Sequence, residues 1–296
     1  MKLAKSAVEL IEICKENNIS LSQYAIAREM EDKGVTKEFL YDHMKKTLHV
    51  MREGATLGRE KAVYSLSGLI GGDAFRLQQY LESGRSLMGN NMIKAMAMAI
   101  SSSEVNSSMG RIVACPTAGS CGILPAVILT AGEQLNKTDE ELVDALFAAS
   151  AIGMLIGMNA TFAGAEGGCQ AECGSAAAMA AGAVVYMMGG TPEMSFHAGA
   201  IVFKNILGLV CDPVAGLVEI PCAKRNASGA VSALSTADLV MAGVTSKIPF
   251  DDALSAMYKV GRSLPAELRE TALGGVAITP TGLKLKEQVF GKSTKN

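Results

Sequence analysis

The feature that most limits how this chain can fold is a run of 21 residues, Ala145 to Ala165, that carries no charged side chain. The run is longer than an ordinary β-strand, and Ala, Gly and Met dominate it rather than β-branched or aromatic residues. It predicts a helix that is apolar on every side, buried either in a membrane or inside a large helical domain. We favour the domain, because Asn159 interrupts the run and no basic flank or aromatic belt borders it.

The rest of the sequence agrees with a mainly α fold. The first third has amphipathic patterns with capping signals, such as the capping-box spacing of Ser20 to Gln23. Thr138 to Glu141 repeats this spacing before the long apolar run. From Gly89 onward the sequence is rich in Ala, Gly, Ser and Met. We predict one large helical domain over residues 1–296, with 1–60 as a loosely attached N-terminal helical segment.

Composition excludes some classes of function. Lys and Arg total 27 against 29 for Asp and Glu, so no basic excess favours binding to nucleic acid. The first helical pattern contains Glu9, Glu12 and Glu16, which a signal peptide would not tolerate. We therefore expect a cytoplasmic protein, in which the seven cysteines stay reduced and serve as metal ligands or as small buried residues.

Four loops rich in Gly, Pro and polar residues interrupt the apolar helices. Loops held by a packed helical body are where binding and catalytic groups concentrate, so we expect the functional residues there. They span Thr117–Gly122, Gly164–Gly174, Cys211–Gly216 and Pro221–Gly229.

The segments CPTAGSCGILPA, GAEGGCQAECG and GLVCDPVAGLVEIPCAKRNASG lie in and around these loops. Together they resemble the iron-sulfur-dependent L-serine dehydratases, and the combination of CDPVAG with PCxxRN is highly specific. The resemblance extends from about Asn90 onward. The total length is similar to that of the separate alpha subunit of the two-chain form.

The resemblance implies that Cys169, Cys211 and Cys222 hold a four-iron four-sulfur (4Fe-4S) cluster. Their separations of 42 and 11 residues match no compact ferredoxin pattern, so the motifs alone make this assignment. Three thiolates leave one iron without a protein ligand, free to act as a Lewis acid on the substrate hydroxyl. The implied reaction eliminates water from L-serine to an aminoacrylate, which yields pyruvate and ammonia.

Other polar residues in the motifs have both functional and structural interpretations. Thr117 and Ser120 stand at a helix start that could bind the substrate carboxylate, or they could simply cap the helix. Arg225 and Asn226 closely follow Cys222. Arg225 could bind a carboxylate through two hydrogen bonds, and Asn226 could bind the substrate or orient a cluster ligand. The structural alternative is that both side chains lie in a solvated loop.

Glu166 and Glu172 bracket Cys169 and could bind the substrate ammonium group, with helix capping as the alternative. Cys173 could neighbour the cluster, although we favour packing. The remaining cysteines are predicted to be buried packing residues: Cys14, Cys115 and Cys121.

A Ser-Ser-Ser-His-Thr motif of the resembled family is missing here. The most similar segment, Ser101 to Glu104, contains no histidine. Of the three histidines, His43 and His49 are expected at the surface, and His197 is not favoured as the base. In single-chain relatives that motif lies in the other domain, so the resemblance implies a separate beta subunit and a hetero-oligomer.

We predict that the chain binds neither nucleic acid nor a membrane. Three alternatives to an L-serine dehydratase are considered. A related cluster lyase could act on L-threonine or L-cysteine. A non-catalytic helical scaffold would use its cysteines only for packing. Dehydration through pyridoxal phosphate is disfavoured, because no lysine stands beside a glycine-rich phosphate loop in a β/α setting.

Overall fold

The computed structural model describes residues 1–291, and their regular structure consists of thirteen α-helices with short 3-10 and π turns. The prediction of a mainly α fold is confirmed. The helices are α1 Ala7–Glu16, α2 Leu21–Lys33, α3 Lys37–Glu60, α4 Asp73–Glu82, α5 Asn90–Ser107, α6 Ile123–Gln134, α7 Asp139–Asn159, α8 Gly164–Gly167, α9 Ser175–Met187, α10 Pro192–Ile206, α11 Cys222–Met241, α12 Phe250–Ser263 and α13 Pro280–Phe290.

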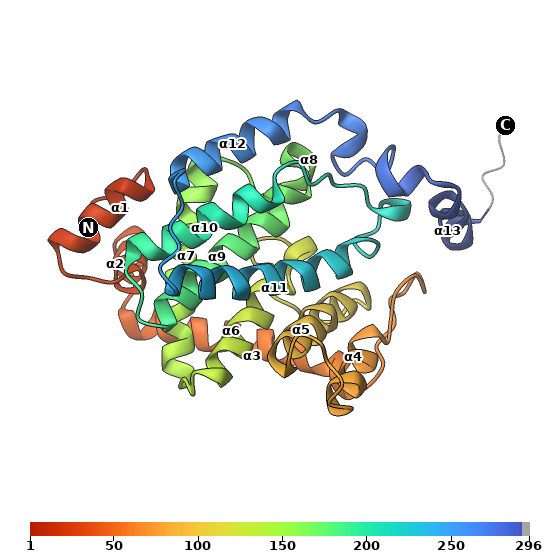
Figure 1. Ribbon diagram of the computed structural model, residues 1–296, viewed down its shortest axis with the longest axis horizontal. Helices are drawn as coiled ribbons and strands as arrows, with labels where there is room; N and C mark the ends of the chain where they lie inside the picture. Colours follow the sequence, from red (N-terminus) through yellow and green to blue (C-terminus); the bar gives the residue numbers. More distant parts are fainter. Residues whose placement is uncertain (292–296) are drawn as a thin grey trace.

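Helix α9 forms the centre of the molecule. Its sequence SAAAMAAGAVVYM has no polar face, and every residue except Tyr186 is buried. Helices α6, α7, α10 and α11 surround it (Figure 1). Small side chains let these neighbours approach closely, so the core is built from many Ala contacts rather than from large aromatic residues.

Helix α7 begins at the predicted capping box and contains most of the long apolar run. Thr138 Oγ1 accepts from Glu141 N, and the Glu141 side chain accepts from Thr138 N. By length and composition the helix could cross a membrane, but 67% of its most apolar window is buried inside the protein. Its apolar side chains pack on α2 and α9, which explains their lack of charge without a bilayer.

Residues 1–60 contribute side chains to the same hydrophobic core. Leu10, Leu21 and Leu48 are fully or almost fully buried, because α1 packs on α10, α2 on α7 and α3 on α5. These long-range contacts join the three N-terminal helices to the rest of the helical domain.

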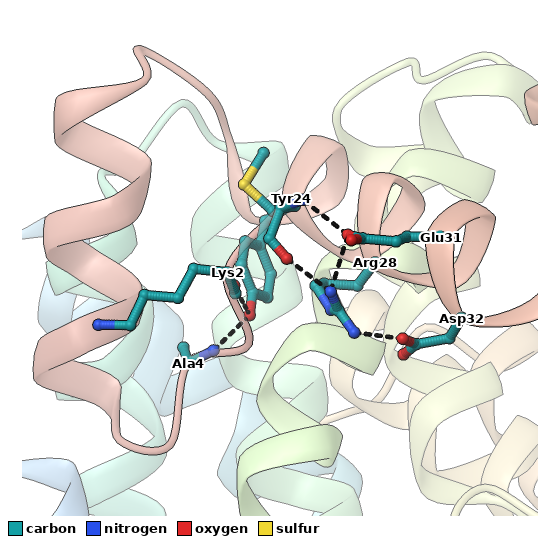
Figure 2. Close-up of polar contacts among 7 residues, drawn as sticks. Lys2, Ala4, Tyr24, Arg28, Glu31 and Asp32 are labelled. Carbon is teal, nitrogen blue, oxygen red and sulfur yellow. Dashed lines mark hydrogen bonds and ion pairs between the residues drawn. The ribbon is translucent and has the colours of Figure 1, made fainter.

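A polar cluster also ties the start of the chain to α2 (Figure 2). The Tyr24 hydroxyl accepts from Ala4 N at 2.7 Å and donates to Lys2 O at 3.1 Å. Arg28 donates to Met1 O and pairs with Glu31, 2.9 Å away. These bonds satisfy polar groups where the segment crosses α2.

We predict that Tyr24→Phe lowers the free energy of unfolding by about 1–3 kcal/mol, because the buried Ala4 N–H loses its acceptor. Tyr80→Phe is the matched control. Its hydroxyl donates to Arg85 O at an exposed site, so the expected loss is below about 0.5 kcal/mol. Urea unfolding measures both, and equal losses would contradict the structural role of Tyr24.

The C-terminal part reaches across to the functional loops. After α12 the chain forms the 3-10 turns η4 (Ala266–Leu268) and η5 (Gly275–Ile278) before α13. Helix α13 lies at the edge of the molecule opposite α1 (Figure 1). The stretch between α12 and α13 runs beside Cys211.

Candidate functional site

The three motif segments meet at the N-terminal end of α9. The first contains the 3-10 turn η1 (Ala118–Ser120) before α6, and the second runs from α8 through Cys169 into the π turn η2 (Gln170–Gly174). The third contains Cys211 and the turn η3 (Val214–Gly216), and it continues into α11, which begins at Cys222. A π turn is uncommon and occurs often at functional sites.

Gln170 fixes the second segment in place. Its side-chain nitrogen donates to Gly167 O and Met257 O, both at 2.9 Å, and its side-chain oxygen accepts from Gly208 N at 2.9 Å. The side chain is completely buried. One amide therefore connects the Cys169 turn to α12 and to the segment that leads to Cys211.

Cys211 is held by backbone bonds to the stretch after α12. Its N–H donates to Leu268 O at 2.9 Å, and its carbonyl accepts from Glu270 N at 2.7 Å. This short parallel pairing fixes the Cys211 backbone although both segments are irregular loops.

The thiols of Cys169, Cys173, Cys211 and Cys222 are buried at this junction. The Sγ atoms of Cys169 and Cys173 share a hydrogen bond of 3.3 Å. Burial raises the pKa of Cys211, and the nearby Cys169 and Cys222 sulfurs raise it further. The three predicted cluster cysteines are therefore close enough for the charge of one to affect the pKa of another, and Cys173 contacts Cys169.

Arg225 supplies positive charge to this group of thiols. The hydrogen bond with Cys173 lowers the pKa of Cys169, and the Arg225 guanidinium lowers it further. Burial raises the pKa of Cys222 to about 12, with Arg225 again acting in the opposite direction. Of the four thiols, Cys169 is therefore the one whose thiolate the surroundings favour.

The Arg225 guanidinium already has protein partners. It donates to Val210 O at 2.9 Å and pairs with Asp212 at 2.9 Å, and the Asp212 side chain is only 3% exposed. The second Asp212 oxygen accepts from Val276 N at 2.7 Å. Arg225 is thus held beside the thiols by a buried ion pair that also anchors η5.

Asn226 joins the first segment to the third. Its side-chain oxygen accepts from Gly122 N at 2.9 Å, and its side-chain nitrogen donates to Gly119 O at 2.7 Å and to Cys222 O at 2.9 Å. Of the two roles predicted for Asn226, orienting the region around Cys222 agrees with these bonds.

Thr117 and Ser120 face Glu172. The Thr117 hydroxyl donates to Glu172 Oε1 at 2.9 Å and lies 3.2 Å from the Ser120 hydroxyl. Glu172 Oε2 lies 3.9 Å from the Cys211 sulfur. The structure therefore brings Glu172 between the first segment and a predicted cluster residue, whereas Glu166 is exposed.

Two glycines leave space around the Glu172 carboxylate. A Cβ on Gly119 would lie 3.1 Å from Oε1. A Cβ on Gly164 would lie 2.6 Å from Oε2 and 3.1 Å from the Cys211 sulfur. Any larger residue at Gly164 must displace these groups.

The remaining sequence candidates lie apart from this junction or serve packing. Cys14, Cys115 and Cys121 are buried as predicted, and the Cys115 and Cys121 sulfurs contact backbone carbonyls. His43 and His49 are exposed as predicted. Among residues 1–291, the ionic neighbour of His197, on α10, is Glu193, 3.9 Å away.

Sequence reasoning missed three features of the site. Asp212 stands in the CDPVAG motif, but its role depends on Arg225. Gln170 stands in GGCQ, but its three partners are scattered along the chain. The stretch from Leu268 to Val276 carries no motif that would have assigned it to the site.

Within residues 1–291, no group of three or more His, Cys, Asp or Glu side chains is arranged to hold a metal ion. The fold and the site define an all-helical protein with buried thiols at a junction of three loops. The family model described as serine dehydratase alpha chain matches residues 16–277.

Relatives cover nearly the whole chain. A probable L-serine dehydratase alpha chain from Bacillus subtilis is 51% identical over 97% of this chain and 95% of its own length. The L-serine dehydratase alpha chain of Peptoniphilus asaccharolyticus is 46% identical over 96% and 97%. L-serine dehydratase 1 of Escherichia coli is 35% identical over 93% of this chain but only 61% of its own length. The chain belongs to the serine dehydratase alpha-chain family.

We predict that Gly164→Ala lowers the free energy of unfolding by about 1–3 kcal/mol, because the added methyl overlaps the buried Glu172 carboxylate and crowds the Cys211 sulfur. Gly54→Ala adds the same methyl inside α3, where the closest atom is 3.5 Å away, and should be neutral or stabilising by up to about 1 kcal/mol. Chemical denaturation of the pair measures the difference. A tolerated Gly164→Ala would contradict the close packing of the junction.

Proposed function

We propose that this chain is the catalytic alpha subunit of an L-serine dehydratase and that Cys169, Cys211 and Cys222 bind a 4Fe-4S cluster. The observation that carries the proposal is the convergence of these cysteines, from three separate segments, at one buried junction beside Arg225. The relatives named L-serine dehydratase support the substrate.

The donor set fits an iron-sulfur cluster. Thiolates are the ligands such clusters require, and a four-iron cluster binds each thiolate at a different iron, so the sulfurs need not converge on one point. The absence of a single-ion arrangement among residues 1–291 is compatible with this geometry. Gly164 adds room, because a side chain there would occupy the space between Glu172 and the Cys211 sulfur.

When bound, the cluster would supply an iron that polarises the substrate hydroxyl as a leaving group. The chain's own residues bind and orient. The Arg225–Asp212 pair keeps a positive charge beside the thiols and so favours their ionised, ligating form. The Thr117 and Ser120 hydroxyls present hydrogen-bonding groups at the edge of the junction. Burial of the thiols excludes water and strengthens these electrostatic effects.

A beta subunit completes the enzyme in this proposal. Relatives of similar length are named alpha chains, and the Escherichia coli relative has additional length that this chain does not match. Residues 1–291 offer no evident base: His197, the only histidine near the motifs in sequence, has the exposed Glu193 as its ionic neighbour. Reduced thiols also require a reducing compartment, so we place the complex in the cytoplasm.

We predict that replacing Cys169, Cys211 or Cys222 by Ser removes the bound iron and the activity, because a hydroxyl is a poor substitute for a thiolate. Cys14→Ser is the control. That residue is buried in α1, far from the motifs in sequence, so its variant should keep the iron even if it is less stable. Iron and sulfide analysis after anaerobic purification measures the effect. Retention of the cluster by all three variants would refute the assignment.

We also predict that the cluster-loaded chain alone is a poor catalyst and that adding the beta subunit raises pyruvate formation at least about 100-fold. The magnitude follows from the usual contribution of a positioned general base. Pyruvate assays on each chain alone and on the mixture measure this. Full turnover by the isolated chain would overturn the two-subunit proposal and leave the cluster assignment intact.

A further inference from the structure

Among residues 1–291, no cationic side chain pairs with the buried carboxylate of Glu172. Its side chain is at the junction, with 8% of the residue exposed. Its contacts are the Thr117 hydroxyl at 2.9 Å and the Cys211 sulfur at 3.9 Å. The nearby cation Arg225 pairs with Asp212 instead.

A buried carboxylate in this position is costly unless a positive charge compensates it. The Thr117 hydroxyl supplies a hydrogen bond to Glu172 but no positive charge. A cationic group bound beside the carboxylate would therefore stabilise its charged form.

We infer that Glu172 binds the α-ammonium group of the amino-acid substrate. The inference deepens the proposed function and rests on it. An amino acid brings the one charge that the carboxylate lacks, and Glu172 lies between the Thr117 hydroxyl and a proposed cluster ligand. An ammonium held there keeps the rest of the substrate beside both groups.

The glycines around Glu172 agree with a ligand-binding role. Gly119 and Gly164 each border one carboxylate oxygen, and neither places a side chain over it. The neighbouring residues Ala118, Ala163 and Ala165 are exposed and small, so none of the three places a large side chain at this edge of the junction.

No other acid near the thiols is placed for this task. Asp212 is occupied on both oxygens, by Arg225 and by Val276 N. Glu166 and Glu270 are exposed, so water screens their charge. Of the two glutamates that bracket Cys169 in sequence, the structure therefore selects Glu172.

The test compares L-serine with 3-hydroxypropionate, which is the same molecule without the amino group. Glu172→Gln keeps the size of the side chain and an oxygen that can accept from Thr117, but it removes the charge. In the cluster-loaded complex with the beta subunit we expect the KM for L-serine to rise about 30-fold or more. The inhibition constant of 3-hydroxypropionate should change less than about 3-fold, and iron content should stay as in the wild type.

Glu193→Gln, at an exposed position on α10, is the control for a carboxylate-to-amide change. Glu172→Asp keeps the charge but withdraws it by one methylene, and it provides the same comparison of ligands with a smaller expected loss for L-serine. It decides the question if the Gln variant does not accumulate as folded protein.

Equal weakening of both ligands would overturn the inference and make Glu172 a positioning residue for Thr117. Loss of iron in Glu172→Gln would overturn it in favour of a role in holding the cluster. An effect of Glu166→Gln, but not of Glu172→Gln, on L-serine would also contradict it. A wild-type complex that forms no pyruvate from L-serine is a different result, because it refutes the proposed function itself.

Discussion

The constraint that shapes this protein is that α9 has no polar face. A helix made of Ala, Gly, Met and Val must be covered on all sides, and α6, α7, α10 and α11 cover it. Polar side chains are therefore scarce along its length. They gather at its N-terminal end, where the π turn, the Cys169 segment and the incoming loops meet. The position of the site follows from the burial of the central helix.

Hydrogen bonds from buried side chains hold this junction together. Gln170, Asn226 and the Arg225–Asp212 pair each connect segments that are distant in sequence. Buried polar networks of this kind are stable only when every member is satisfied, so they fix one geometry of the loops. Through Asp212 the network also includes the stretch that leads to α13. The C-terminal region therefore contributes to the site although it holds none of the cysteines.

Much of the fold could be predicted from local patterns. The capping boxes at Ser20 and Thr138 mark helix starts that the structure confirms, and the uncharged run indicated a buried helix. The packing partners of α1 and α2 could not be predicted in the same way, because α10 and α7 are distant in sequence. For the site, the motifs located the segments, but they did not show that Arg225 and Asn226 have protein partners. Those partners, Asp212 and Gly119, become neighbours only after the chain has folded.

The central claim is that three thiolates hold a four-iron cluster and leave one iron open to the substrate. Mössbauer spectroscopy of the anaerobically reconstituted chain, loaded with isotopically enriched iron, tests it most directly when spectra are recorded with and without L-serine. The account predicts about four irons per chain, with about one quarter of the iron signal changing when L-serine is added. Four equivalent irons that ignore L-serine, or a chain that retains no cluster, would contradict it.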